Sequence, residues 1–258
     1  MRQFMITTFL LLAGAAGSAQ AQGFIENKDY YPVVPAQHTN VDPGKIEVLE
    51  VFSYGCPFCS QLNPFMREYR RTLPPNVQLL YLPASFNPAE DWPMFQRAAI
   101  TAQVLGIFDK THDAVFDSVW NGGELAILDP ATKGIRSRLP TIEDAARFYA
   151  RVGGVPAAEF LEVAHGFAVD TRIRAAENLI LAYHVDSTPT IIVNGKYRIT
   201  GVSAGNLERM IAVTRWLVAQ ETAAAAKAAT PAKTAAPAKA SPAAATPAAK
   251  GTPAAPKH

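Results

Sequence analysis

The placement of strand-like and helix-like segments constrains the fold of this sequence more than any other feature. Apolar runs typical of strands occur at 46–53 and 77–82, and again at 190–193 and 197–200. Between Pro88 and Val185 the apolar residues recur almost only at helical spacing. Asn194 and Gly195, which join the last two strands, are a strong two-residue hairpin signal.

This order predicts an α/β fold in which a mixed sheet domain is interrupted by an inserted all-helical domain. We place the sheet domain at 22–88 and 184–221, and the insertion, about 95 residues long, at 89–183. Helices are expected at 58–72, 91–105, 110–119, 141–151, 156–165, 168–183 and 207–220.

Both ends of the chain are predicted to lie outside this fold. Residues 1–21 have Arg2, a mostly apolar stretch and Ala19-Gln20-Ala21, which together indicate a cleaved secretory signal peptide. The apolar stretch is shorter than the ~20 residues that span a bilayer. Residues 222–258 are rich in Ala, Pro and Lys and contain no larger aliphatic or aromatic side chain, which predicts a disordered tail.

The charge distribution argues against a nucleic-acid partner. The formal net charge is +2, but residues 222–258 contribute five Lys and no acid, and Arg2 lies in the leader. The remaining body is therefore net acidic and lacks the basic face that binds phosphates.

Both cysteines of the chain lie in one motif, Cys56-Pro57-Phe58-Cys59. A bridge across two residues constrains the unfolded chain little, so a structural disulfide is a poor explanation. A zinc site requires about four ligands, and the His residues form no ligand pair at helical spacing. We therefore expect reversible thiol chemistry and no metal or organic cofactor.

The position of the motif explains its reactivity. Cys56 follows a strand and opens a helix, where unpaired backbone N–H groups and the helix dipole favour the thiolate. Pro57 suits the first helical turn. We expect Cys56 to form the mixed disulfide with a substrate, and Cys59, one turn later and facing inward, to resolve it.

The segment from Val48 to Cys59 resembles the active site of the DsbA family of thiol:disulfide oxidoreductases, and Thr188-Pro189-Thr190 resembles that family's cis-proline loop. The resemblance implies a thioredoxin-like fold with a helical insertion and a cis bond before Pro189. It also implies a monomeric periplasmic dithiol oxidase that acts on reduced or unfolded exported proteins and is re-oxidised by a membrane partner.

Glu50 is unusual because it stands among apolar residues of the first strand. One reading is an exposed carboxylate at a strand edge. The other, which matches the family, is a buried acid near Cys59 that relays protons during exchange.

Three positions depart from the family pattern. Phe58 replaces the common His, and it can donate neither a hydrogen bond nor a positive charge to the sulfur. Asn63 and Tyr81 stand where Glu and Lys are expected, which suggests a thinner charge network around Glu50. We therefore predict a Cys56 pKa above, and an oxidising power below, those of a Pro-His member.

Three alternatives to the oxidase remain. A disulfide isomerase or reductase could use the same cysteines, although residues 22–45 are too few for a dimerisation domain. A chaperone or binding module could use an apolar face around Phe58, Trp92 and Phe95. Finally, Gly201-Val202-Ser203-Ala204-Gly205 matches a nucleophile-elbow pattern, but the only later His is His258, so we expect Ser203 near a helix start.

Overall fold

The computed structural model describes residues 23–229, and the predicted signal peptide and residues 230–258 of the predicted tail lie outside that range. Within it, a five-stranded mixed sheet has the order β1-β5-β4-β2-β3. The strands are β1 (Tyr31–Pro32), β2 (Ile46–Phe52), β3 (Val77–Pro83), β4 (Thr190–Val193) and β5 (Tyr197–Thr200). β2 pairs with β3 in parallel and with β4 antiparallel, so β2 is an interior strand.

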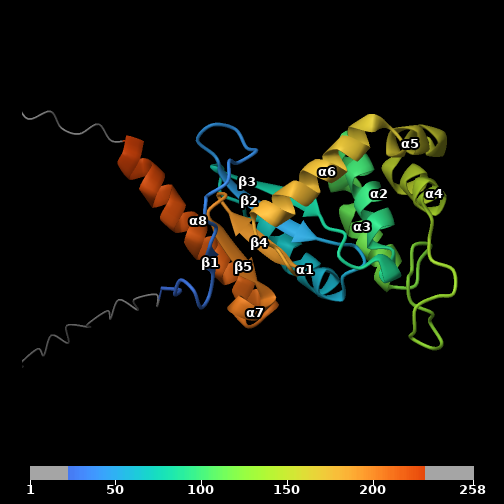
Figure 1. The fold of residues 1–258 in the computed structure, drawn as a ribbon, viewed down its shortest axis with the longest axis horizontal. Helices are drawn as coiled ribbons and strands as arrows, with labels where there is room; N and C mark the ends of the chain where they lie inside the picture. The colour runs from blue at the N-terminus through green and yellow to red at the C-terminus, as the bar shows by residue number, and fades with distance from the viewer. Residues whose placement is uncertain (1–22, 230–258) are drawn as a thin grey trace, which may run out of the picture.

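The helices fall into two groups. Two long helices and one short one belong to the sheet domain, namely α1 (Pro57–Arg71), α8 (Leu207–Ala229) and α7 (Gly201–Ala204). The block between β3 and β4 holds η1 (Pro88–Glu90), α2 (Trp92–Val104), α3 (Phe108–Trp120), α4 (Ile142–Gly153), α5 (Ala157–Ala164) and α6 (Phe167–Ala182). Figure 1 shows α2 to α5 gathered at one end of the molecule, with α6 running from that group back to the sheet.

Helices cover both faces of the sheet. Ile46, Val48 and Ile191 pack against α1 and α8 on one face, whereas Leu49, Val51 and Ile192 pack against α2 and α6 on the other. The alternation of side chains along β2 explains why all seven of its residues are buried. The predicted fold class is therefore confirmed, and the exact domain boundaries stay predictions.

The core of the helical block reaches the start of α1. It is built around large aromatic side chains, including Tyr54, Trp92, Phe95 and Phe116, and it also contains Cys56 and Cys59. The cysteines therefore lie where the helical insertion meets the sheet domain. None of the helices in residues 23–229 is long and apolar enough to cross a membrane.

We expected no strand at Tyr31–Pro32, where β1 lies, and we placed the end of the last helix wrongly. We predicted a helix over 207–220 and a disordered tail from 222, but α8 continues to Ala229. Residues 223–229 are almost all Ala, the best helix former, and the first Pro is at 231. A helix already anchored on the sheet extends through such a segment without burying it, because only nucleation is costly.

A buried carboxylate attaches α8 to the β4–β5 hairpin. Glu221 is 7% exposed, and its Oε2 accepts hydrogen bonds from the Asn194 amide and from Lys196 Nζ, the latter at 2.6 Å. Asn194 and Gly195 both have positive φ, 52° and 67°, as the tight two-residue turn requires. The hairpin geometry and the docking of α8 therefore depend on each other.

We predict that Glu221→Ala lowers the free energy of unfolding by about 1–3 kcal/mol, because it leaves the Asn194 amide without its acceptor. Denaturant unfolding of the purified protein measures this loss. Glu177→Ala, at an exposed position of α6, is the matched control and should change stability by less than about 0.5 kcal/mol. Equal losses in the two variants would contradict the prediction.

Candidate active site

Cys56 is the N-cap residue of α1. Its backbone is extended, with φ −86° and ψ 118°, and Pro57 occupies the first position of the helix. The backbone N–H of Cys59 donates a hydrogen bond to Cys56 Sγ at 3.3 Å. The sulfur thus stands where the unpaired amides of the first turn converge, as the sequence predicts.

The Cys56 thiol has a pKa below the ordinary value for cysteine. A hydrogen bond from the Cys59 thiol, together with the Thr188 side chain and the backbone amides of Cys59 and Phe58, lowers the pKa of Cys56 to about 7, while burial acts in the opposite direction. At neutral pH about half of this thiol is therefore ionised.

Cys59 has the opposite character. It is fully buried, and burial, the hydrogen bond to Cys56 and the charges of Cys56 and Glu50 raise its pKa well above the ordinary value. The two cysteines are free thiols in this structure. One pair of residues in a single helical turn therefore provides one ionisable sulfur and one that remains protonated.

The loop before β4 lies against the Cys56 sulfur. The Thr188–Pro189 bond is cis, as the family resemblance implies. The Cys56 thiol donates to the Thr188 carbonyl at 3.4 Å. The Thr188 hydroxyl is buried and has no hydrogen-bond partner within residues 23–229, so it is free to donate to the thiolate once the proton leaves.

An apolar groove of about 430 Å³ begins beside the cysteines. It is lined by Phe58, the Thr188–Pro189 loop, and residues around α7 and the start of α8. Cys56 itself is only 3% exposed, whereas Phe58 is 58% and Val202 is 90% exposed. The accessible surface at the site is thus formed mainly by the residues around the sulfur.

Glu50 lies in the middle of β2 and is buried, so the reading of an exposed edge carboxylate is wrong. Its Oε2 has no hydrogen-bond partner among the described residues. Burial, together with the Cys56 charge, raises the pKa of Glu50 to about 8, while Arg70 acts in the opposite direction. Glu50 is therefore mostly protonated at neutral pH, next to the buried sulfur whose pKa it raises.

The polar groups around Glu50 differ from those that the sequence suggested. Tyr81 is the direct neighbour of Glu50 across the β2–β3 pair. Asn63 on α1 donates to Asp113 of α3 at 3.0 Å, and Asp113 also pairs with Arg70 at 3.2 Å. Positive charge near Glu50 thus comes from Arg70, whose pairing with Asp113 could not be predicted from the sequence because 43 positions separate the two residues.

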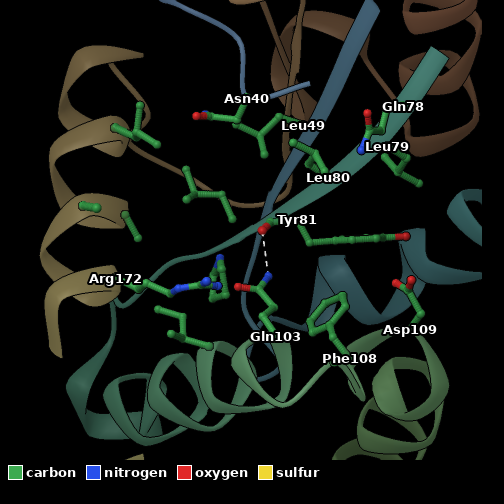
Figure 2. A pocket seen from close by; sticks show the side chains of 17 residues that line it. Asn40, Leu49, Gln78, Leu79, Leu80, Tyr81, Gln103, Phe108, Asp109 and Arg172 are labelled. Atoms are coloured by element: carbon green, nitrogen blue, oxygen red, sulfur yellow. Dashed lines mark hydrogen bonds between the residues drawn. The ribbon is translucent and has the colours of Figure 1, made fainter. Parts of the chain in front are cut away.

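A larger pocket, of about 600 Å³, opens elsewhere along the β3 edge. Figure 2 shows Gln103 donating to the Tyr81 carbonyl at 2.9 Å, with Phe108, Asp109 and Arg172 on the pocket walls. Neither cysteine nor Glu50 lines this pocket. Tyr81 is shared between this pocket and the surroundings of Glu50.

Ser203 is not a nucleophile poised for catalysis. Its Oγ accepts from the Thr200 N–H at 3.0 Å, and Thr200 Oγ1 accepts from the Ser203 N–H at 3.0 Å. This reciprocal capping box opens α7, in agreement with the helix-start reading.

Comparison with known proteins identifies close sequence relatives, although no protein-family model matches the chain. The thiol:disulfide interchange protein DsbA of Pseudomonas aeruginosa is 33% identical over 231 residues, which cover 88% of this chain and 100% of that protein. The protein of the same name from Pseudomonas syringae is 35% identical over 226 residues, which cover 87% of this chain and 98% of that protein.

Solved structures agree with these relatives. The crystal structure of Pseudomonas aeruginosa DsbA matches with a TM-score of 0.66 at 32% identity, over 79% of this chain and 97% of that one. The oxidoreductase DsbA from Xylella fastidiosa matches with a TM-score of 0.66 at 30% identity, over 76% of this chain and 96% of that one.

The buried Glu50 predicts a specific dependence of stability on pH. Its pKa is about 8 in the folded state and near 4.5 when unfolded, so the folded state holds the extra proton and loses stability as pH rises from 4.5 towards 8. Glu50→Gln removes this loss, which is on the order of a few kcal/mol. The variant should therefore gain much more stability over the native protein at pH 8.5 than at pH 4.5.

Urea unfolding of the reduced proteins at the two pH values measures the difference. Glu177→Ala, at an exposed site of α6, should show no pH-dependent gain. A gain for Glu50→Gln that is equal at both pH values would show that the carboxyl is not protonated in the fold.

Proposed function

The chain belongs to the DsbA family of thiol:disulfide interchange proteins, and we propose that it oxidises reduced exported proteins with Cys56 as the reacting sulfur. It is a thiol:disulfide oxidoreductase. The observation that carries the proposal is the asymmetry of the two thiols, because only Cys56 has both a lowered pKa and the groove beside it.

The reaction begins from the Cys56–Cys59 disulfide. A substrate thiolate attacks Cys56 Sγ, the bond between the two protein sulfurs breaks, and Cys59 leaves with the electron pair. A second substrate thiolate then attacks the substrate sulfur of the mixed disulfide and releases Cys56 as a thiolate. The substrate loses two electrons, and the protein gains them as the dithiol form of this structure.

Glu50 supports this reaction as a proton relay. The departing Cys59 sulfur is buried and has a raised pKa, so it must take up a proton. Glu50 is mostly protonated near pH 7 and is close enough to raise the pKa of Cys59. It can hand its proton to this sulfur and receive it again when the disulfide re-forms.

The surroundings of Cys56 suit unfolded substrates. The carbonyl of Thr188 lies 3.4 Å from the sulfur, next to Pro189, and an extended peptide can pair with the main chain of such a loop. The groove that starts at Phe58 offers apolar contact without selecting one sequence. We place this activity in the periplasm, in a monomer that a membrane partner re-oxidises.

The alternatives fit less well. Residues 31–32 form β1, which pairs with β5 of the same sheet, so this part of the chain adds to the oxidoreductase domain and forms no separate dimerisation module. A binding module without chemistry would have no use for a thiol with a pKa near 7 beside one with a raised pKa.

The purified, oxidised protein should introduce disulfides into a reduced, unfolded test protein faster than it reduces or reshuffles them. Mixed with a test protein that already contains disulfides, Cys59→Ser should accumulate a mixed disulfide, because Cys56 attacks a substrate disulfide, one substrate sulfur leaves as a thiolate, and the resolving sulfur is gone. Cys56→Ser should form no such adduct, since Cys59 is fully buried. Peptide mass mapping of the trapped adduct checks this, and an adduct on Cys59 or oxidation by Cys56→Ser would refute the assignment.

Because the pKa of Cys56 is lowered only to about 7, we predict that the protein is a weak oxidant. Half-ionisation at pH 7 stabilises the reduced form by less than about 1 kcal/mol, or below about 20 mV. The side chain of Phe58 cannot donate to the sulfur. Phe58→His adds a donor and should lower the Cys56 pKa. A fall of one pKa unit raises the equilibrium constant for oxidation of glutathione by the protein disulfide about fivefold at pH 7. Phe58→Leu is the control without a donor; no difference between the two variants would contradict this account.

A further inference from the structure

Three side chains of the helical insertion hold the short turn that joins β2 to α1. Trp120 Nε1 at the end of α3 donates to the Tyr54 carbonyl at 2.8 Å. The Tyr54 hydroxyl lies 3.0 Å from Nδ1 of His112, also on α3. Gly55 lies directly against the Trp92 indole of α2, so that a Cβ there would stand 2.6 Å from the ring.

The contact between Tyr54 and His112 is a buried, uncharged hydrogen bond. Both residues are about 1% exposed. Burial lowers the pKa of His112 to about 3, although Asp113 raises it and Arg70 lowers it, so the imidazole is neutral. Aromatic rings surround the imidazole, with the Tyr81 and Phe108 centroids each 4.7 Å away. Water competes little for such a bond, and losing one partner leaves a buried polar group unsatisfied.

These contacts hold the two residues that immediately precede Cys56. The Cys56 N–H donates to the Ser53 carbonyl at 3.1 Å and the Gly55 N–H donates to Ser53 Oγ at 3.2 Å, which closes a tight turn. Tyr54 and Gly55 are the two central residues of that turn. Because the turn is short and bonded at both ends, the position of Tyr54 determines where Cys56 Sγ meets the first-turn amides.

We propose that His112, Trp120 and Trp92 are positioning residues through which the helical insertion sets the ionisation of Cys56. They act through the backbone of Tyr54 and Gly55, whereas Cys59, Thr188 and the Phe58 amide act on the sulfur directly. The helical insertion therefore helps to set how readily the Cys56 thiol ionises. The inference rests on the proposed role of Cys56 as the reacting sulfur.

The test removes one hydroxyl group. Tyr54→Phe keeps the ring and its packing but loses the bond to His112. Titration of the thiolate by its ultraviolet absorbance should show a Cys56 pKa raised by about half a unit or more, a threefold change in the ionisation constant. Tyr183→Phe is the matched control, because its hydroxyl is equally buried, has no hydrogen-bond partner within residues 23–229, and packs on the opposite face of the sheet.

A double-mutant cycle tests whether His112 acts on Cys56 through Tyr54. His112→Phe should raise the Cys56 pKa as Tyr54→Phe does, and the double variant should show the same rise as either single one. His112→Asn, which keeps a polar group near the position of Nδ1, should restore part of the effect. If Tyr54→Phe does not fold, His112→Phe carries the same test with Tyr54 intact.

An unchanged ionisation constant in Tyr54→Phe, with only a loss of stability, would overturn the inference, as would additive shifts in the double variant. The proposed function would stand if Cys59→Ser still traps substrate at Cys56, so the two failures are distinguishable.

Discussion

The hydrogen bond from the Cys59 amide to Cys56 Sγ is the interaction on which the site depends. It exists because β2 ends four residues before Cys56, and α1 begins one residue after it. The backbone amides of a first helical turn have no partner within the helix, so they stabilise a negative sulfur placed at the cap. The same turn places Cys59 inside the core. A single local geometry thus creates two thiols of opposite character.

Other parts of the fold maintain the difference in pKa between Cys56 and Cys59. The interior position of β2 buries Glu50, and burial keeps its carboxyl protonated near Cys59, the sulfur to which we propose it gives its proton. The β4 loop adds Thr188 on one side of Cys56, and the helical insertion holds Tyr54 and Gly55 on the other. A buried acid and a buried hydroxyl without a partner are costly in a fold, and here Glu50 lies close enough to affect the pKa of Cys59, and Thr188 that of Cys56.

Much of this arrangement follows from local sequence, and the rest does not. The strand–cysteine–helix order and the Asn194-Gly195 hairpin are set by neighbouring residues, and both agree with the structure. The sequence left two readings of Glu50 open, and the structure supports the buried one. The contacts of Tyr54 with His112 and Trp120 span 58 and 66 positions, so no periodicity could reveal them. The continuation of α8 to Ala229 follows from the Ala content of residues 223–229, because a segment of good helix formers extends an existing helix at little cost.

The pH dependence of alkylation in the reduced native protein tests the central claim most directly. A small alkylating reagent, applied over a pH series and followed by peptide mass analysis, reports each thiol separately. The account predicts that Cys56 reacts with a midpoint near pH 7 and that Cys59 stays unmodified in the folded protein. A Cys56 midpoint at the ordinary value near 9, or equal reaction of both cysteines, would contradict it.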